Sequence, residues 1–382
     1  MPLTFKQSKE YSLGVELELQ LLDKESLALV PKSGQIIAGF DDSPPFVKPE
    51  LMLSNVEVNT RPCSSIEAVQ EDLLTKLDLV YREALRYDTT LSLAGTHPFS
   101  SWKEQGFVPD ERYTRLLDKL GAVARRFNIF GLHVHVGIDC GEKCIFIMNS
   151  LLYYLPHLLA LSANSPFWNG EDTGLKSYRS KVFEALPTAG VPAYFDGWSD
   201  YSSLVDMYIS TGTIETIREI WWDVRPHPDF GTLEIRVCDA PCSIKQLISI
   251  VALIQALVAR LGRAFDEGVK LDLAPYFILK ENKWRAARYG LDASFILPDG
   301  SGTIAFKDAV TELYSYVYDE AMKMGSEDHL AGIKDILKYG NGASRQLHIW
   351  KENCNLKSVV KSLSDGFIDE IGAHVKSGES NR

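Results

Sequence analysis

Apolar and polar residues alternate most clearly over positions 13–21. Leucine or valine fills every odd position of this stretch, while Gly14, Glu16, Glu18 and Gln20 fill the even positions. Successive side chains of a strand point to opposite faces, so the pattern predicts a strand with one buried and one polar face. Glu16 and Glu18 are then neighbours about 7 Å apart on the polar face. A single pair of this kind is usually a solvated strand face and indicates no function by itself.

The same alternation recurs in three further stretches of the chain. Their polar positions hold Glu57 and Asn59, His133 and His135, and Glu234 and Arg236. Ordinary exposed strands also carry threonine, lysine and glutamine, whereas these carry glutamate, histidine, asparagine and arginine. If the strands join one sheet, its polar face gathers carboxylates and imidazoles above an apolar underside. We interpret that face as a site for two or more divalent cations, because hard cations take oxygen ligands and manganese-type sites tolerate imidazole.

A helical period of apolar residues predicts the remaining large elements. We expect a helix from a capping box of Ser64 and Glu67 to about Tyr87, and further helices over 110–126, 144–163 (kinked near Pro156) and 243–268. Together the elements predict an α+β fold in which helices back the polar-faced strands. We expect one domain over residues 1–382, mostly helical from about 305 to 375.

Composition and charge exclude some classes of function. The 382 residues are 45% hydrophobic and 24% charged, as in soluble globular proteins. A formal net charge of −11 without a long basic run argues against general binding of nucleic acids or membrane surfaces. An anionic small substrate remains allowed, because bound metal ions reverse the local field. The first seven residues lack the apolar core of a signal peptide, which predicts a cytoplasmic protein.

Two C-x3-C pairs, Cys140 with Cys144 and Cys238 with Cys242, could together make a four-cysteine zinc site. Each pair follows a predicted strand and opens a helix, where small thiols pack well, and a cytoplasmic chain keeps them reduced. We therefore favour a packing role for the four cysteines. His97 ends a predicted buried strand, and we favour a structural role for it as well.

Acidic metal ligands near arginines suit phosphate chemistry, because metals bridge phosphoryl oxygens and arginines bind phosphate or carboxylate through two donors. Arg236 shares its strand face with Glu234, and Arg285 and Arg288 share one face of a predicted helix. The other candidates are Arg179, Arg225 and Arg345. No phosphate-binding P-loop is present, so a nucleotide would bind on the sheet through metals.

The order E-x-E, H-x-H and E-x-R on strands resembles the catalytic sheet of the glutamine synthetase superfamily. Longer strings narrow the resemblance to the YbdK-type carboxylate–amine ligases, the type 2 glutamate–cysteine ligase family, over residues of about 10 to 350. The strings that carry it are GVELE (14–18), GLHVHVG (131–137), LSANSPFW (161–168), DTG (172–174), SYRS (177–180), WDVRP (222–226), TLEIRVCD (232–239) and ENKWRAARYG (281–290).

The resemblance implies a single catalytic domain built on a curved, largely antiparallel sheet, polar on its concave face and backed by helices. It also implies ATP-dependent amide formation through an acyl phosphate, with substrates such as glutamate and cysteine. By carry-over, two or three Mg²⁺ or Mn²⁺ ions would be held by Glu16, Glu18, Glu57, His133 and Glu234. It gives the transferring phosphoryl group to Arg236, the substrate carboxylate to Arg225, other anionic groups to Arg179, and nucleotide contacts to His135, Arg285 and Arg288. No nucleic acid or membrane partner is implied, and a homodimer is left open.

Two alternatives remain at this point. One is a phosphagen-type guanidino kinase on the same sheet, which would leave a stable phosphorylated product and no amide. The other is a non-catalytic relative that binds a metal or a nucleotide. ATP turnover over a panel of acids and amines would separate both from a ligase.

Overall fold

The computed structural model describes residues 3–40 and 45–380. Within these residues, seven strands form one sheet in the order β10-β11-β5-β1-β3-β2, with β4 paired to the end of β1, and all neighbours are antiparallel. The strands are β1 (Leu13–Asp23), β2 (Val47–Pro49), β3 (Asn55–Asn59), β4 (Thr89–Ser92), β5 (Gly131–Gly137), β10 (Val224–His227) and β11 (Thr232–Asp239). The four alternating stretches therefore join one sheet, and the predicted α+β fold is confirmed.

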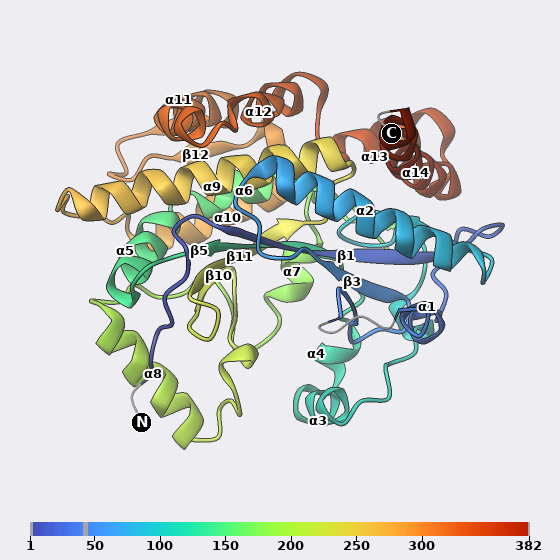
Figure 1. The fold of residues 1–382 in the computed structure, drawn as a ribbon, viewed down its shortest axis with the longest axis horizontal. Helices are drawn as coiled ribbons and strands as arrows, with labels where there is room; N and C mark the ends of the chain where they lie inside the picture. Colours follow the sequence, from blue (N-terminus) through green and yellow to red (C-terminus); the bar gives the residue numbers. More distant parts are fainter. Residues whose placement is uncertain (1–2, 41–44, 381–382) are drawn as a thin grey trace.

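The underside of the sheet is apolar and covered by helices. Each odd residue of β1 from Leu13 to Leu21 is at most 1% exposed. In Figure 1, α2 (Ile66–Leu85) and α9 (Ile244–Asp266) lie on the same side of the sheet, above it in this view. Within the described residues, α9 is the one unbroken helix that is long and apolar enough to cross a membrane. Its most apolar stretch of 18 residues is 83% buried inside the protein.

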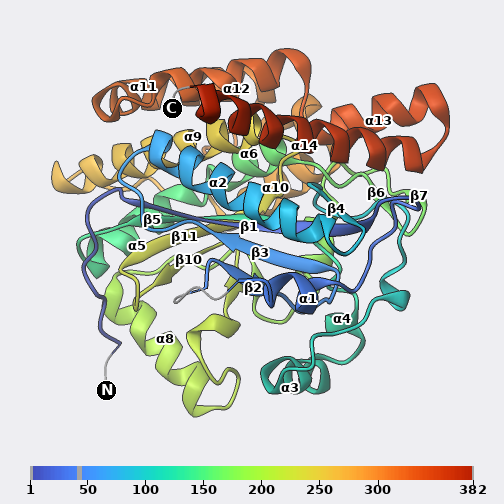
Figure 2. The ribbon, with the colours of Figure 1, turned by 45° about the vertical axis from the view of Figure 1, so that its right-hand side comes forward.

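Further helices extend this covering layer. The predicted kink near Pro156 is a break between α5 (Gly141–Leu151) and α6 (Leu155–Ser162), which are bent by 64°. Helix α10 (Tyr276–Tyr289) packs against α6, and α11 (Phe306–Met324) and α12 (Glu327–Tyr339) pack against α9. The last helices are α13 (Gly342–Asn353) and α14 (Leu356–Ser380), and Figure 2 shows α14 lying beside α2.

Smaller elements lie on the polar side of the sheet, where α3 (Glu111–Leu120), α4 (Ala122–Arg125) and α8 (Trp198–Ser210) appear below it in Figure 1. Three short elements, η3 (Gly290–Asp292), β12 (Ser294–Ile296) and β13 (Thr303–Ala305), pack instead against helices of the covering layer. The remaining short elements of the fold are α1 (Ser33–Ile37), η1 (Trp102–Glu104), β6 (Phe167–Trp168), β7 (Glu171–Asp172), α7 (Arg179–Phe183), β8 (Ala189–Gly190), η2 (Ile217–Glu219) and β9 (Trp221–Trp222).

Two helix predictions were wrong in detail. The helix expected over 110–126 is two helices, because Gly121 has a φ of +56°, a conformation that ends α3. The N-cap of α2 is Ser65 and not Ser64, since the Ser65 side chain accepts a hydrogen bond from the backbone N–H of Ala68. Glu67 then lies in the first turn without completing the predicted box.

Candidate active site

A cavity of about 430 Å³ lies on the polar face of the sheet. Its floor consists of the polar side chains of β1, β3, β5, β10 and β11. Its opposite wall comes from α3, α4, α7 and the segments beside them. It combines apolar side chains with three arginines, and its residues include Leu116, Leu120, Phe127, Phe183 and Trp221 as well as Arg112, Arg179 and Arg218. The cavity therefore joins a floor rich in carboxylates to a wall of mixed apolar and cationic character, which suits a ligand that has both anionic and less polar parts.

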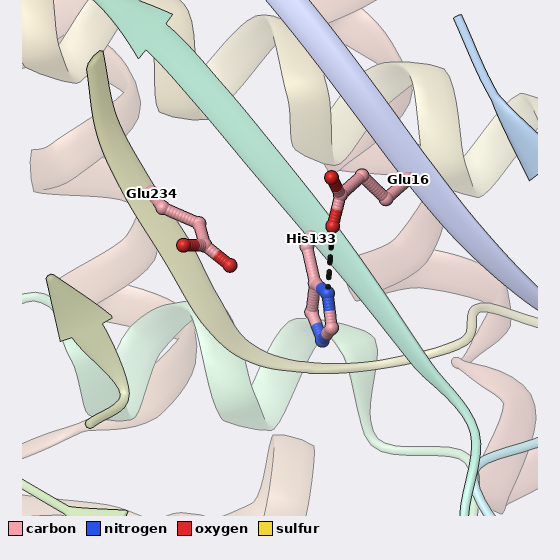
Figure 3. Close-up of side chains that lie close together, drawn as sticks. All are labelled: Glu16, His133 and Glu234. Atoms are coloured by element: carbon pink, nitrogen blue, oxygen red, sulfur yellow. Dashed lines mark hydrogen bonds and ion pairs between the residues drawn. The ribbon is translucent and has the colours of Figure 1, made fainter. Parts of the chain in front are cut away.

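Glu16, His133 and Glu234 meet from three neighbouring strands, as Figure 3 shows. Glu16 pairs directly with His133 across β1 and β5, and His133 Nδ1 lies 3.3 Å from Glu16 Oε2. One donor atom from each of the three residues lies within 4.8 Å of the others. This is a spacing at which the three side chains could share one metal ion.

A second donor group uses the same histidine. Glu18, Glu57 and His133 also place donor atoms within 4.8 Å of one another. Glu18 pairs with Glu57 across β1 and β3, and its carboxylate accepts a hydrogen bond from the backbone N–H of Gly131. Burial raises the pKa of Glu57 well above its ordinary value, and the neighbouring carboxylates of Glu16 and Glu50 add to the shift. Such crowding is costly without a cation between the carboxylates.

Glu50 is a cavity residue that the sequence interpretation did not select. Its carboxyl lies beside that of Glu57, and burial followed by repulsion from Glu18 raises its pKa to about 7. Glu50 follows the short strand β2 in the turn toward β3, so no alternation of apolar and polar residues marks it. The only signal in the sequence was an acidic residue in a turn leading to the Glu57 strand.

The donor sets fit Mg²⁺ or Mn²⁺. Both groups offer carboxylate oxygens and one imidazole, which is a hard donor set with a single nitrogen. Burial and the nearby guanidinium of Arg236 lower the pKa of His133, so its ring is neutral near pH 7, as metal ligation requires. His133 belongs to both groups, but a neutral imidazole ligates through one nitrogen, so it would complete one of the two overlapping positions.

Glu234 lies between two guanidinium groups. Arg225 Nε donates to Glu234 Oε2 at 2.7 Å, and Arg236 donates through NH1 to Glu234 Oε1. Burial opposes the charge of Glu234, but Arg225 and Arg236 outweigh it and hold the pKa of this carboxyl well below its usual range. Glu234 is therefore an ionised donor in a fixed orientation.

The two arginines differ in what they leave free. Arg225 also donates through NH1 to the backbone carbonyls of Ile217, Arg218 and Ile220, at 3.3, 3.0 and 2.7 Å. Its guanidinium is thus engaged by the protein and orients Glu234. Arg236 Nε is buried without a hydrogen-bond partner, and its guanidinium packs over the ring of Phe183 in the cavity wall. Arg236 retains donors for a ligand, whereas Arg225 retains few.

Arg179 lines the cavity from the start of α7. Its backbone N–H donates to Ser165 Oγ at 3.0 Å, and Ser165 Oγ donates to Asp239 Oδ2 at 2.6 Å. Asp239 is fully buried and also accepts a hydrogen bond from Ser177 at 2.8 Å. The strings LSANSPFW, SYRS and TLEIRVCD thus converge on one buried carboxyl that fixes the start of α7 and with it Arg179.

The arginines of the ENKWRAARYG string, expected to contact the nucleotide, lie outside the cavity. Arg285 donates to Glu281 and to the backbone of Ser294, Arg288 contacts the carbonyl of Gly174, and neither arginine lines the cavity. The buried cation of the string is Lys283, which lies 2.5 Å from Asp223 and 2.6 Å from Glu184. The third candidate arginine outside the cavity is Arg345, which donates to the backbone carbonyl of Ser362 at 2.7 Å. The structure brings the other residues of the predicted site together.

The remaining histidines and the cysteines considered in the sequence analysis can also be located in the structure. His135 lines the cavity between Glu16 and Glu234, with Nε2 at 3.4 and 4.0 Å from their carboxylates. His97 is buried away from the floor, with Nε2 3.0 Å from the Leu27 carbonyl, and Nδ1 accepts from the backbone of Ser100. The cysteines of both pairs are free thiols, and Cys144, Cys238 and Cys242 are buried, consistent with packing.

Comparison with known proteins identifies the family to which this chain belongs. The profile described as glutamate–cysteine ligase family 2 matches residues 12–362. The chain belongs to this family. It is 40% identical over 370 residues to a protein of Gloeobacter violaceus provisionally named glutamate–cysteine ligase 2, covering 96% of this chain and all of that one. A Thermobifida fusca protein of the same name is 40% identical over 373 residues, covering 96% and 93% of the two chains.

Solved structures share the fold at low sequence identity. The glutamate–cysteine ligase of Francisella tularensis, crystallised with AMP, superposes with a TM-score of 0.70 at 14% identity, over 96% of this chain and 90% of that chain. A bifunctional glutathione synthetase of Pasteurella multocida also gives a TM-score of 0.70, at 15% identity, over 95% and 53% of the two chains. These similarities show that the chain shares the fold of these two structures.

Proposed function

We propose that this protein is an ATP-dependent carboxylate–amine ligase that forms an amide through an acyl phosphate. The observation that carries the proposal is the pair of donor groups that share His133, with Arg236 beside them on the same floor. Membership of glutamate–cysteine ligase family 2 supports amide formation over guanidino phosphorylation and over a role without catalysis. As in the names of its relatives, glutamate and cysteine are the first acid and amine to test.

Mg²⁺ or Mn²⁺ would be held by Glu16 with Glu234 at one position and by Glu18 with Glu57 at the other, and His133 would complete one of the two. When bound, such ions neutralise phosphate oxygens and orient the triphosphate. Glu50, beside Glu57, would complete the second position. Both positions lie within reach of His133, and Arg225 fixes the direction of the Glu234 carboxylate.

Arg236 would stabilise the phosphoryl group as it moves from ATP to the carboxylate of the acid. Its charge faces the cavity, and its Nε is still available as a donor. In the first step a carboxylate oxygen attacks the γ-phosphorus and ADP leaves. In the second step the amine attacks the acyl carbon, and phosphate leaves with the electrons of the broken C–O bond. No side chain acts as a nucleophile, so catalysis rests on positioning and electrostatics.

The free carboxylate of an amino-acid substrate needs a cation. Arg225 was the sequence-based choice, but its guanidinium is engaged by Glu234 and three carbonyls. Arg112 on α3 and Arg218 on η2 also line the cavity and are exposed. We assign the substrate carboxylate to these two arginines and place the reaction in the cytoplasm, where ATP is available.

Release of ADP over a panel of acids and amines tests the proposal. The expected result is turnover that needs a divalent cation, an acid and an amine together, with an amide as product. Turnover that yields a stable phosphorylated compound without an amide would indicate a kinase instead. No turnover with any pair at saturating Mg²⁺ would leave only the non-catalytic alternative.

A further inference from the structure

An exposed aromatic ring lies at the edge of the cavity without a role in the metal or phosphate sites. Phe230, in the turn between β10 and β11, is 55% exposed and lines the cavity. Among residues 3–40 and 45–374, whose side chains the structure describes, it is the one large exposed apolar side chain that does so. An apolar ring left open inside a ligand cavity is best explained by a ligand that covers it.

The turn that presents Phe230 is fixed by the rest of the protein. The backbone N–H of Lys6 donates to the Pro228 carbonyl at 2.9 Å, and that of Ile138 donates to the Gly231 carbonyl at 2.9 Å. Gly231 has a φ of +65°, and a Cβ at this position would lie 2.2 Å from the Lys6 carbonyl oxygen. Only glycine fits there, so the backbone of the turn that carries Phe230 is fixed before any ligand binds.

A second ring supports Phe230 from behind. The ring of His227 stacks on it, with centroids 4.1 Å apart and planes 8° from parallel. The His135 ring contacts Phe230 edge-on, with centroids 5.9 Å apart. One face of Phe230 is therefore covered by His227, and its exposed area lies at the edge and the other face. This leaves a flat apolar surface open to a planar ligand group.

The aromatic surface is continuous with the charged floor through His135. The same ring that touches Phe230 has its Nε2 3.4 Å from Glu16 and 4.0 Å from Glu234, two of the donors of the first metal position. A ligand with phosphates on that position can therefore reach Phe230 with a group attached to the phosphates. A nucleotide has both parts, an anionic chain and a planar base.

We propose that Phe230, backed by His227, is the surface on which the base of ATP stacks. This inference rests on the proposed function and adds the position of the nucleotide base to it. The sequence interpretation sought nucleotide contacts at Arg285 and Arg288, which lie outside the cavity. Stacking recognises the flat face of a base and not its hydrogen-bonding edge, so purines should bind better than pyrimidines because they offer a larger face.

Binding of two probes separates stacking from phosphate binding. The dissociation constants of ADP and of inorganic tripolyphosphate, each with Mg²⁺, are measured by calorimetry for the parent, Phe230→Ala and Phe230→Trp. Loss of a base–aromatic stack is worth ~1–3 kcal/mol, so Phe230→Ala should weaken ADP binding roughly 5- to 150-fold and leave tripolyphosphate binding unchanged. Phe230→Trp should bind ADP at least as tightly as the parent.

Phe277→Ala is the matched control, because Phe277 is 71% exposed on α10 and does not line the cavity. It should leave both dissociation constants at parent values. Parent-like ADP binding by Phe230→Ala would overturn the stacking role and leave the ligase proposal standing. Equal weakening of ADP and tripolyphosphate would also overturn it. If the parent binds neither probe, the ligase proposal and the stacking role fall together.

Discussion

Glu18 and Glu57 lie directly opposite each other on β1 and β3, and both carboxylates approach His133 on the floor of the cavity. Like charges opposite each other in a sheet are destabilising, so the protein keeps this pair at a cost to its stability. The pKa of Glu57 is raised mainly by burial and then by Glu16 and Glu50, and Glu18 adds a smaller contribution. A divalent cation between the carboxylates would relieve it.

The first prediction concerns Glu57→Gln, which keeps the shape of the side chain and removes its charge. We expect kcat to fall at least ~100-fold, since charge stabilisation by a metal is worth several kcal/mol. The melting temperature of the metal-free protein should stay equal or rise, because repulsion is relieved. Steady-state ADP release and thermal unfolding measure the two effects. Glu281→Gln, a partner of Arg285 outside the cavity, is the control, and near-parent turnover of Glu57→Gln at saturating Mg²⁺ would contradict the role.

The second prediction is a pH dependence of stability at Glu50. Its pKa is raised from 4.5 to about 7 by burial and by Glu18. Below pH 4.5 the carboxyl is protonated in both states, and between 4.5 and 7 the unfolded state ionises first, so the metal-free parent loses stability as the pH rises. The stability of Glu50→Gln relative to the parent should therefore grow over this range and stay constant above it. Urea unfolding of both proteins in a chelator measures the difference, and a difference independent of pH would be the contrary result.

The third prediction concerns Arg236→Lys. Lysine keeps the charge but loses the planar group that holds two oxygens at once. If Arg236 stabilises phosphoryl transfer, kcat should fall by roughly 10²–10⁴, with the melting temperature and nucleotide affinity close to those of the parent. Arg285→Lys provides a matched control outside the cavity. A lowered melting temperature with unchanged kcat would mean that Arg236 serves the sheet through its pair with Glu234.

The fourth prediction tests whether Arg179 must stay in place. A Cβ on Gly131 would lie 2.2 Å from the NH2 nitrogen of Arg179, so Gly131→Ala should displace the guanidinium. Overpacking of this kind typically costs about 1–3 kcal/mol, and we expect a lower melting temperature together with reduced kcat. Gly302→Ala, where a Cβ meets nothing within 4 Å, should change neither property. Parent-like turnover of Gly131→Ala would remove Arg179 from the mechanism.

The strands of the sheet could be predicted because apolar and polar residues alternate along them with a period of two. Leu13 to Leu21 alternate without interruption, and a slip of one residue would bury the glutamates, so faces and register follow from the pattern. The helix break at Gly121 and the N-cap at Ser65 were missed because both depend on one backbone conformation that neighbouring residues do not signal. The antiparallel α+β fold itself was predicted correctly.

The site was less readable, because it depends on contacts between distant segments. The register between β5 and β11 shifts between Ile235 and Cys238, an irregularity next to Arg236 that alternation alone cannot indicate. Glu50 lies in a turn and Phe230 in a hairpin, where no period identifies the side that faces the cavity. Arg285 and Arg288 share a helix face with period 3.6, but neither lines the cavity. Lys283 of the same helix is buried and forms ion pairs inside the protein.

In the proposed reaction, a carboxylate oxygen attacks the γ-phosphorus of ATP. The most direct measurement uses the acid that supports the fastest ADP release, labelled with ¹⁸O in its carboxylate, together with ATP, Mg²⁺ and the amine. Mass spectrometry then follows the label into inorganic phosphate. Because the attacking carboxylate oxygen leaves with phosphate, we expect one labelled oxygen in each phosphate released, with amide and ADP formed in equal amounts. Unlabelled phosphate, or ADP formed with a stable phosphorylated product and no amide, would contradict it.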